Sequence, residues 1–171
     1  NGWWYGVDSI DSTVERALKV KEMGFTALKW DPFPGPWRTF ISRAEEDYAV
    51  DNVRAVREAL GPGMDLLIDA HRRVAPHHAI RVAKRLEEFD IFCYEEPSLS
   101  DNIELVAETR RAISTPVVTG ETLYTKEDFA RVLEHRAADM LNPDICAVGG
   151  LLQMLDIATM AQPHAVGICP H

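Results

Sequence analysis

The sequence predicts an α/β fold in which parallel strands and outer helices form a barrel, and two observations carry this prediction. Short apolar runs alternate with amphipathic segments along the chain, which is typical of strands joined by helices in a parallel sheet. Ionisable side chains follow five of the apolar runs, at positions 69, 95, 121, 144 and 171, so successive groups are 23 to 27 residues apart. One strand and one helix of a parallel barrel need about 25 to 30 residues, and groups at the C-terminal strand ends converge on one mouth.

Composition places the chain among ordinary globular proteins and narrows its partners. Its 171 residues are 46% hydrophobic and 26% charged, which suffices for one domain with a core. The net charge of −9 argues against nucleic acid as a partner, because phosphate binding requires a basic surface. No apolar run approaches the roughly 20 residues of a membrane span, and no signal peptide is present, so we expect no membrane partner. Cys93, Cys146 and Cys169 lack metal-type spacing and lie in apolar runs, so we expect reduced core thiols in a cytoplasmic protein.

The first part of the chain is predicted to hold two strands, one helix and a stiff loop. Residues 1–6 have the pattern of a strand that enters a loop, residues 12–23 form a helix, and residues 25–29 form the second strand. The segment 31–37 contains three prolines, which remove backbone donors and fix φ, so it cannot be regular structure. Long loops at a barrel mouth are often functional.

The later helices are predicted from their caps and apolar faces. The second helix covers about residues 44–60, and Pro76 opens the third. Capping pairs mark the starts of the first, fourth and fifth helices: Ser12 with Glu15, Asp101 with Glu104, and Thr125 with Asp128. The sixth helix follows Gly149-Gly150, and we expect it to be buried through Leu151, Met154, Leu155 and Ala158.

The element count is about seven strands and six helices, which is one strand short of an eight-stranded barrel. The remaining strands are the apolar runs at 64–68, 92–94, 117–120, 140–143 and 165–170. A barrel without one strand leaves open edges, which would expose unpaired backbone. Because the chain starts at Asn1 and stops at a strand end, we expect it to be an internal piece of a longer polypeptide.

Three carboxylates, Asp69, Glu95 and Glu121, end successive strands and should meet at the mouth. Without a counterion they would repel one another and raise one another's pKa values. A hard divalent cation resolves this repulsion, and three carboxylates with room for water suit octahedral Mg²⁺. The alternative is three acids on loops that face solvent.

Other ionisable groups at the same strand ends suggest acid–base chemistry. A carboxylate beside an imidazole orients the ring and raises its pKa, so Asp144 and His171 could form a general base, although a structural hydrogen bond would look the same. Lys29 could hold a substrate carboxylate or stabilise its enolate, or be a surface lysine with a solvated head. Weaker candidates for substrate contacts are Asp31, Arg73 and Trp37. An arginine in a loop is more commonly solvated, and a tryptophan more commonly packs against other side chains.

These residues together resemble a known family. The chain is similar to the enolase superfamily, mandelate racemase subgroup, and within it to acid-sugar dehydratases such as the galactonate dehydratases. The motifs that carry the resemblance are Lys29-Trp30-Asp31, Asp69-Ala70-His71, Tyr94-Glu95-Glu96-Pro97, Gly120-Glu121, Asn142-Pro143-Asp144 and Pro170-His171. The resemblance implies a (β/α)7β barrel and covers residues 1–171 as a partial C-terminal barrel domain. The α+β capping domain and the last strand would then be absent from this chain.

The resemblance also implies roles for individual residues. Asp69, Glu95 and Glu121 would bind Mg²⁺, Asp144 and His171 would form the base dyad, and His71 would be the acid that expels a β-hydroxyl. The superfamily uses a Lys or His base with Mg²⁺ to stabilise an enediolate. Racemases of the subgroup carry a second lysine where this chain has Asp31, which disfavours two-base racemisation.

The expected activity is therefore β-elimination from a sugar acid, which gives a 2-keto-3-deoxy acid. His171 would remove the proton α to the carboxylate, Lys29 and the metal would stabilise the enediolate, and His71 would protonate the leaving hydroxyl. Two alternatives remain: a cycloisomerase on the same barrel, and an inactive fragment or pseudoenzyme. We expect the full-length protein to be a homo-oligomer with a small-molecule substrate.

Overall fold

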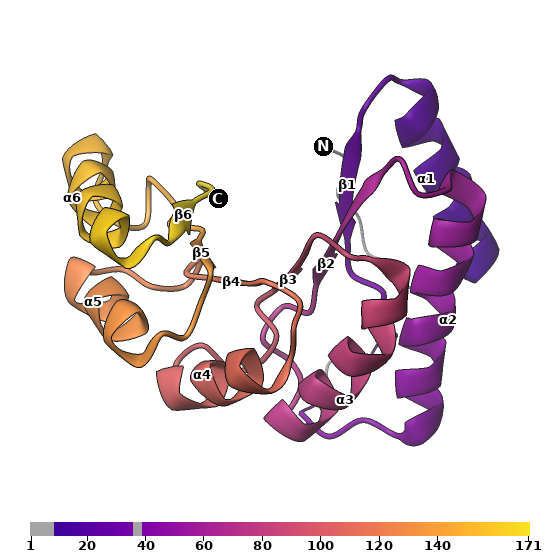
Figure 1. Cartoon of the computed structure of the whole chain (residues 1–171), viewed down its shortest axis with the longest axis horizontal. Helices are drawn as coiled ribbons and strands as arrows, with labels where there is room; N and C mark the ends of the chain where they lie inside the picture. Colours follow the sequence, from indigo (N-terminus) through magenta and orange to yellow (C-terminus); the bar gives the residue numbers. More distant parts are fainter. Residues whose placement is uncertain (1–8, 36–38) are drawn as a thin grey trace.

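The computed structural model describes residues 9–35 and 39–171, and in them six parallel strands form one sheet in the order β1-β2-β3-β4-β5-β6. The strands follow an open arc with the helices on its convex side (Figure 1). The predicted parallel α/β fold is thus confirmed. The strand predicted at 1–6 lies outside the described residues.

The strands are longer in the first half of the chain than in the second. The strands are β1 Ala27–Trp30, β2 Asp65–Asp69, β3 Cys93–Glu95, β4 Val117–Thr119, β5 Met140–Leu141 and β6 Gly167–Ile168. In β1 and β2 one face is fully buried, through Leu28, Trp30, Leu66 and Ile68, whereas the other face of β2 changes from the exposed Asp65 to the buried Asp69. All residues of β3 and β4 are buried, as expected for a parallel sheet covered by helices.

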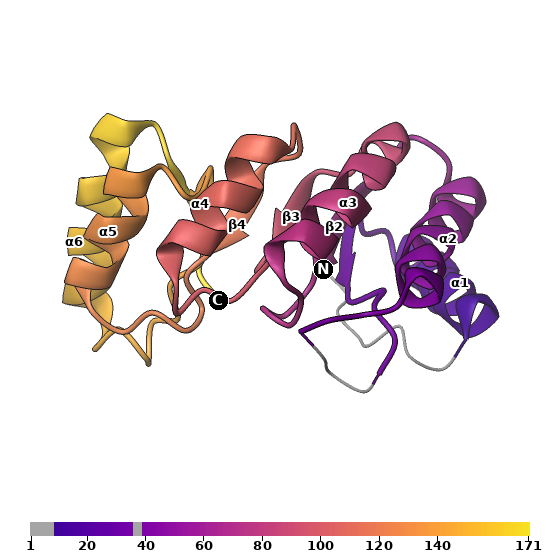
Figure 2. The same ribbon diagram turned by 90° about the horizontal axis from the view of Figure 1, so that it is seen from below.

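Within the described residues, six α-helices cover the outside of the sheet. They lie side by side in chain order when seen from below (Figure 2). Their bounds are α1 Ile10–Glu22, α2 Arg43–Leu60, α3 Pro76–Leu86, α4 Ile103–Ala112, α5 Lys126–His135 and α6 Leu151–Ala161. Two short 3₁₀ turns follow α3 and α6, at Glu87–Phe89 and Gln162–His164. No helix in the described ranges is both long and apolar enough to span a membrane.

The caps confirm some predicted helix boundaries and correct others. Thr125 and Asp128 form the predicted capping box of α5. The cap of α1 is Ser9, whose hydroxyl accepts from the Ser12 backbone N–H, so the prediction of Ser12 as the cap was wrong. The cap of α4 is Asn102 rather than Asp101, and its side chain makes no capping bond. The sequence prediction missed the capping box of α2, formed by a serine at 42 and a glutamate at 45.

The core divides into two apolar clusters that meet near the middle of the sheet. The first packs α1, α2 and α3 against β1 and β2, with Leu28, Val53 and Leu66 fully buried. The second packs α4, α5 and α6 against β4 and β5, and includes Phe129 and Ile157. The strands that carry the site residues therefore pack against apolar side chains of the helices on their outer face.

Helix α6 departs from its predicted packing. Met154, Ile157 and Ala161 face the core, whereas Leu151 and Leu155 are 70% and 61% exposed. The predicted buried face was therefore wrong for these two leucines. Because α6 lies at the end of the row of described helices (Figure 2), only the face toward α5 and the sheet is covered.

Candidate active site

The three predicted metal carboxylates all lie at the C-terminal ends of their strands. Asp69 and Glu95 are the last residues of β2 and β3 and are paired across the sheet, which brings them side by side. Both are buried, at 2% and 4% exposure. Glu121 follows the end of β4 by two residues, and its side chain approaches His171 rather than the other two acids.

Lys29 stands between the first two carboxylates. Its Nζ donates to Glu95 Oε1 at 2.6 Å and lies 3.9 Å from Asp69 Oδ2. Burial lowers the pKa of Lys29, but the charge and hydrogen bond of Glu95, with Asp69 and Glu121, outweigh it and raise the pKa. Lys29 is therefore a paired cation of the site, which excludes the alternative of a solvated surface lysine.

The same crowding acts on Asp69. Burial and then the charge of Glu95 raise the pKa of Asp69 from 3.8 to about 6, although His71 and Lys29 act in the opposite direction. Two buried carboxylates with one shared lysine thus leave negative charge that a further cation would neutralise. The donor chemistry fits Mg²⁺, which prefers carboxylate oxygens. In the side-chain positions of residues 9–35 and 39–171, however, no three His, Cys, Asp or Glu residues form a preassembled metal cluster.

Asp144 and His171 form the predicted dyad at the ends of β5 and β6. His171 Nδ1 lies 3.2 Å from Asp144 Oδ2, and its Nε2 lies 3.2 Å from Glu121 Oε2. The other oxygen of Asp144 accepts from the backbone N–H groups of Cys146 and Ala147. The Ala147 bond, with those of His171 and Cys146, lowers the pKa of Asp144, so the carboxylate stays ionised beside the imidazole.

His71 occupies the opposite side of the site in a similar arrangement. Its Nδ1 lies 3.0 Å from Asp31 Oδ2 and its Nε2 lies 3.4 Å from Asp69 Oδ2. The backbone of His71 is left-handed, with φ of 50°, and its N–H donates to Asp69 Oδ1 at 3.0 Å. Each of the two histidines therefore has one nitrogen on an aspartate and the other directed at a predicted metal ligand.

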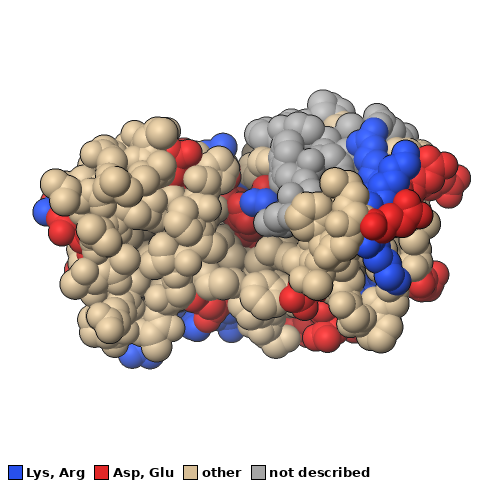
Figure 3. Space-filling view, turned by 90° about the horizontal axis from the view of Figure 1, so that it is seen from above, with Lys and Arg blue, Asp and Glu red and all other residues tan. Residues whose placement is uncertain are grey.

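A cavity of about 1030 Å³ joins these groups. Its lining includes Lys29, Asp69, His71, Glu121, Asp144 and His171. From above, a small group of acidic and basic side chains lies at the centre of the molecule, beside a largely uncharged region on the left, while further charged side chains form a band toward the right edge (Figure 3). The predicted catalytic residues thus share one space although they come from five different strand ends.

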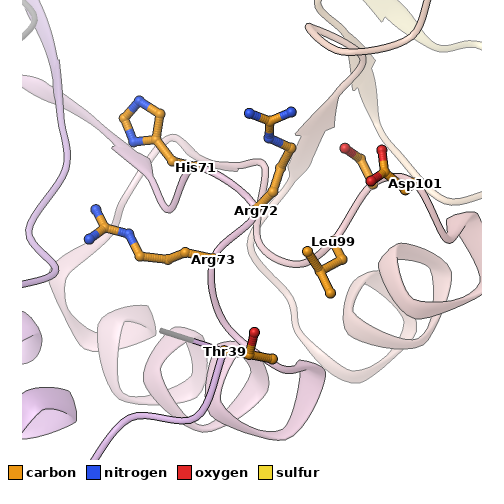
Figure 4. Close-up of a pocket in the computed structure, with 7 residues that line it drawn as sticks. Thr39, His71, Arg72, Arg73, Leu99 and Asp101 are labelled. Atoms are coloured by element: carbon orange, nitrogen blue, oxygen red, sulfur yellow. The ribbon is translucent and has the colours of Figure 1, made fainter. Parts of the chain in front are cut away.

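A second cavity of about 270 Å³ lies beside the loop that follows β2 (Figure 4). Thr39, Arg73, Leu99 and Asp101 line it, and the His71 and Arg72 side chains rise from the same loop on one side. His71 and Arg72 also line the larger cavity. The loop after β2 therefore separates the two hollows.

Two buried residues next to the site were not among the predicted ligands and catalytic groups. Glu96 was named only as part of the motif Tyr94-Glu95-Glu96-Pro97. Its side chain accepts from the Gly120 N–H at 2.7 Å and from the Thr119 hydroxyl at 3.0 Å, and these two donors directly precede Glu121 in the chain. Burial raises the pKa of Glu96 to about 7. Asn142 donates to Glu95 Oε1 at 3.1 Å. The only sequence signal for Asn142 was its position, as a polar residue at the end of an apolar run.

The weaker predictions fare differently. Asp31 is fully buried and contacts His71 and Arg73 rather than the cavity, so its prediction as a substrate contact is not supported by its position. Arg73 is also buried, and lines only the smaller hollow. Trp37 lies outside the described residues. The prediction of three buried cysteines was wrong, since Cys93 is buried and the other two are exposed.

Comparison with known proteins identifies the family. The family described as enolase C-terminal domain-like matches residues 12–171. This chain belongs to that family.

Relatives of known name come from the same group. The chain is 33% identical over 171 residues to a D-gluconate dehydratase from Thermoproteus tenax, and 39% identical over 167 residues to a D-galactarolactone cycloisomerase from Agrobacterium fabrum. These alignments cover 100% and 96% of this chain but 34% and 42% of the two relatives. The chain thus spans well under half the length of either.

A solved structure supports the same fold. An L-talarate dehydratase from Polaromonas, complexed with Mg and L-glucarate, superposes with a TM-score of 0.84 and 29% identity, over 95% of this chain and 43% of that one. The resemblance to the mandelate racemase and acid-sugar dehydratase group is therefore confirmed for the barrel portion. These relatives include two dehydratases, named for D-gluconate and L-talarate, and one cycloisomerase, named for D-galactarolactone.

Proposed function

We propose that this chain carries the catalytic site of a Mg²⁺-dependent dehydratase of sugar acids, within a longer cytoplasmic enzyme. The observation that carries the proposal is the pair of imidazoles on either side of the carboxylates. His71 reaches toward Asp69 and His171 toward Glu121, each with its Nδ1 on an aspartate. Such a pair supplies an acid and a base for one substrate held between them.

The metal would be held by Asp69, Glu95 and Glu121. Bound there, it supplies positive charge that acidifies the proton α to a substrate carboxylate. The charge left on the buried Asp69–Glu95 pair supports this assignment. The solved dehydratase with Mg and L-glucarate supports it independently, as a property of that protein.

The chain's own residues would perform the remaining steps. His171 accepts the α-proton through Nε2, while Asp144 orients the ring from Nδ1 and stabilises the imidazolium. Lys29 neutralises charge that develops on the substrate carboxylate oxygen. His71 donates a proton to the β-hydroxyl, so the C–O bond breaks, water leaves, and the resulting enol tautomerises to a 2-keto-3-deoxy acid.

The two histidines can be separated by following exchange and elimination in the same sample. In the full-length protein, His171→Asn should abolish dehydration and the exchange of the substrate α-proton with solvent deuterium. His71→Asn should lower dehydration by roughly 10² to 10⁴ and retain part of the exchange, because the base remains. Proton NMR in deuterated water measures exchange, and a keto-acid assay measures elimination on a panel of sugar-acid diastereomers.

Exchange that persists in the His171 variant would exclude His171 as the base, and equal loss of both activities in the two variants would exclude His71 as a dedicated acid. A cycloisomerase is the second candidate, supported by the 39% identical relative. It would consume a lactone without releasing a keto acid. Absence of any turnover, together with no Mg²⁺ binding by titration calorimetry, would identify an inactive protein.

A further inference from the structure

Arg72 lies in the loop after β2, and the proposed chemistry does not use it. Its side chain is 30% exposed and lines the cavity of about 1030 Å³ that holds the candidate site. Figure 4 shows its guanidinium on the same side of the loop as the His71 ring, pointing away from Thr39 and Leu99. The loop therefore presents a cation to this large cavity beside the proposed acid.

The Arg72 guanidinium donates no hydrogen bond to any residue that the structure describes. Its ion pair with Glu121 joins Nε and Oε1 at 3.8 Å, which is beyond hydrogen-bond distance. The neighbouring Arg73 is the opposite case, because its side chain is only 2% exposed and pairs with Asp31. Of the two adjacent arginines, Arg72 is thus the one whose N–H donors are available to a ligand in the large cavity.

The backbone at Arg72 has a conformation that favours glycine. Its φ is 58°, in the left-handed region, where a side chain costs stability. The Arg72 N–H donates to the Glu96 carbonyl at 2.8 Å, so this part of the loop is held through the main chain rather than through the arginine side chain. Non-glycine residues in such conformations concentrate at functional sites. An arginine at this position therefore indicates that its side chain has a use.

Lys29 and Arg72 pair with different acids of the site. Lys29 Nζ donates to Glu95 at 2.6 Å and lies 3.9 Å from Asp69, whereas Arg72 approaches Glu121. Among the ion pairs of residues 9–35 and 39–171, these two cations share no partner. In the proposed reaction Lys29 faces the carboxylate that reacts, which leaves Arg72 for another anion. A metal that draws on the Glu121 carboxylate would weaken its pairing with Arg72, and a substrate anion would replace it.

We propose that Arg72 binds a second anionic group of the substrate, at the end remote from the carboxylate that reacts. A planar guanidinium matches a carboxylate or a phosphate through two parallel hydrogen bonds. The substrate is then a sugar acid with an anion at both ends, either a dicarboxylic acid or a phosphorylated one. The large cavity, of about 1030 Å³, has room for a six-carbon acid. This inference rests on the proposed function and names the substrate class for the same site.

The test uses sugar acids that differ only at C6, in the full-length protein with saturating Mg²⁺. Gluconate is compared with glucarate and 6-phosphogluconate, and galactonate with galactarate. The kcat/KM of the dianionic member should exceed that of the neutral-ended member by roughly 10- to 100-fold, the usual contribution of charge-assisted hydrogen bonds. Whichever of the carboxylate and the phosphate is preferred identifies the group that Arg72 binds. Equal kcat/KM for dianionic and neutral-ended acids would overturn the proposal.

Arg72→Gln separates a substrate contact from a structural role. It should lower kcat/KM for the dianionic acid by roughly 10- to 100-fold and change that for the neutral-ended acid by less than threefold. Both values come from one metal-saturated variant, so an effect on metal binding through Glu121 cancels in their ratio. Arg72→Lys keeps the charge without the two parallel hydrogen bonds and should retain part of the preference. An equal fall for both acids in Arg72→Gln would contradict the proposal.

Arg72→Gly and Arg136→Gly form a matched pair of variants. Arg136 also has a left-handed φ, of 50°, but it is exposed at the end of α5 and lines a separate cavity of about 360 Å³. Glycine accepts both conformations, so neither variant should melt at a lower temperature than the parent. Only Arg72→Gly should lose the preference for the dianionic acid. The same loss in Arg136→Gly would show a general effect of net charge and refute a contact at Arg72.

Calorimetry distinguishes failure of this inference from failure of the proposed function. Binding of the dianionic and neutral-ended acids is measured in His171→Asn, which removes the proposed base, with and without Arg72→Gln. If the parent turns over no sugar acid, yet Arg72→Gln weakens binding of the dianion by roughly 10- to 100-fold, only the proposed function is refuted. Dehydration that does not depend on Arg72 refutes only this inference. Absence of binding for every acid refutes both.

Discussion

Replacement of Asp69 by asparagine in the metal-free protein should change how stability depends on pH. Asp69 has an ordinary pKa of 3.8, and burial beside Glu95 raises it to about 6 in the folded state. The folded protein therefore binds this proton more tightly than the unfolded chain does. The resulting stabilisation is fully present below about pH 4 and is lost as pH rises through about 6.

The size of the effect follows from the shift. One pKa unit corresponds to about 1.4 kcal/mol, so a rise from 3.8 to about 6 corresponds to about 3 kcal/mol. Asp69→Asn cannot titrate, and its amide oxygen can still accept from the His71 N–H. The unfolding free energy of the parent, minus that of the variant, should thus decrease by about 2 kcal/mol between pH 4 and pH 7, because part of the full effect is already lost at pH 4.

Urea unfolding, followed by far-UV circular dichroism in the presence of a chelator, measures this difference at each pH. Asp144→Asn is the matched control, because hydrogen bonds from Ala147 and then His171 lower the pKa of Asp144. Its contribution is lost only as pH falls below about 4, so the corresponding difference should be flat between pH 4 and pH 7.

Added Mg²⁺ should change the sign of the slope for the parent alone, because a metal ligand must be ionised and binding to the folded state stabilises it. Parallel stability curves for the parent and Asp69→Asn, with and without Mg²⁺, would show that Asp69 neither carries a raised pKa nor binds the metal.

Three further substitutions test the support of the site and the packing around it. Gly120→Ala should cost at least 1 to 3 kcal/mol and weaken Mg²⁺ binding, because φ is +137° and a Cβ would lie 2.7 Å from Phe129 Cε1; unchanged urea midpoint and calorimetric affinity would contradict this. Ile157→Ala should cost about 2 to 5 kcal/mol of stability, whereas Leu155→Gln should change stability by about 0.5 kcal/mol or less, because Ile157 is buried and Leu155 is exposed. Similar losses of stability for the two variants in thermal melts would mean that both faces of α6 are covered in solution. Ser42→Ala should cost about 1 kcal/mol by removing the capping box of α2, and a melting temperature equal to that of the parent would argue against that box.

The sequence by itself determined the parallel α/β repeat and the position of most site residues along it. Asp69 and Glu95 could be located because each ends an apolar run, and consecutive parallel strands present their C-terminal ends at one edge. The same reasoning predicted Asp144 and His171 as neighbours, and their side chains are 3.2 Å apart. These predictions depend on local pattern and on the regularity of the fold, which a sequence records directly.

The tertiary structure alone decided what several residues contact. The contacts of Asp31 could not be predicted, because its partner His71 is 40 residues away and the sequence equally allowed a side chain that faces substrate. Leu155 is apolar at helical spacing, yet whether that face is covered depends on which element packs beside α6. Ser9 rather than Ser12 caps α1 because the helix already begins at Ile10, and the extended backbone of Ser9 places its hydroxyl on the Ser12 N–H. In each case a contact between particular atoms, rather than a repeating pattern, determines the outcome.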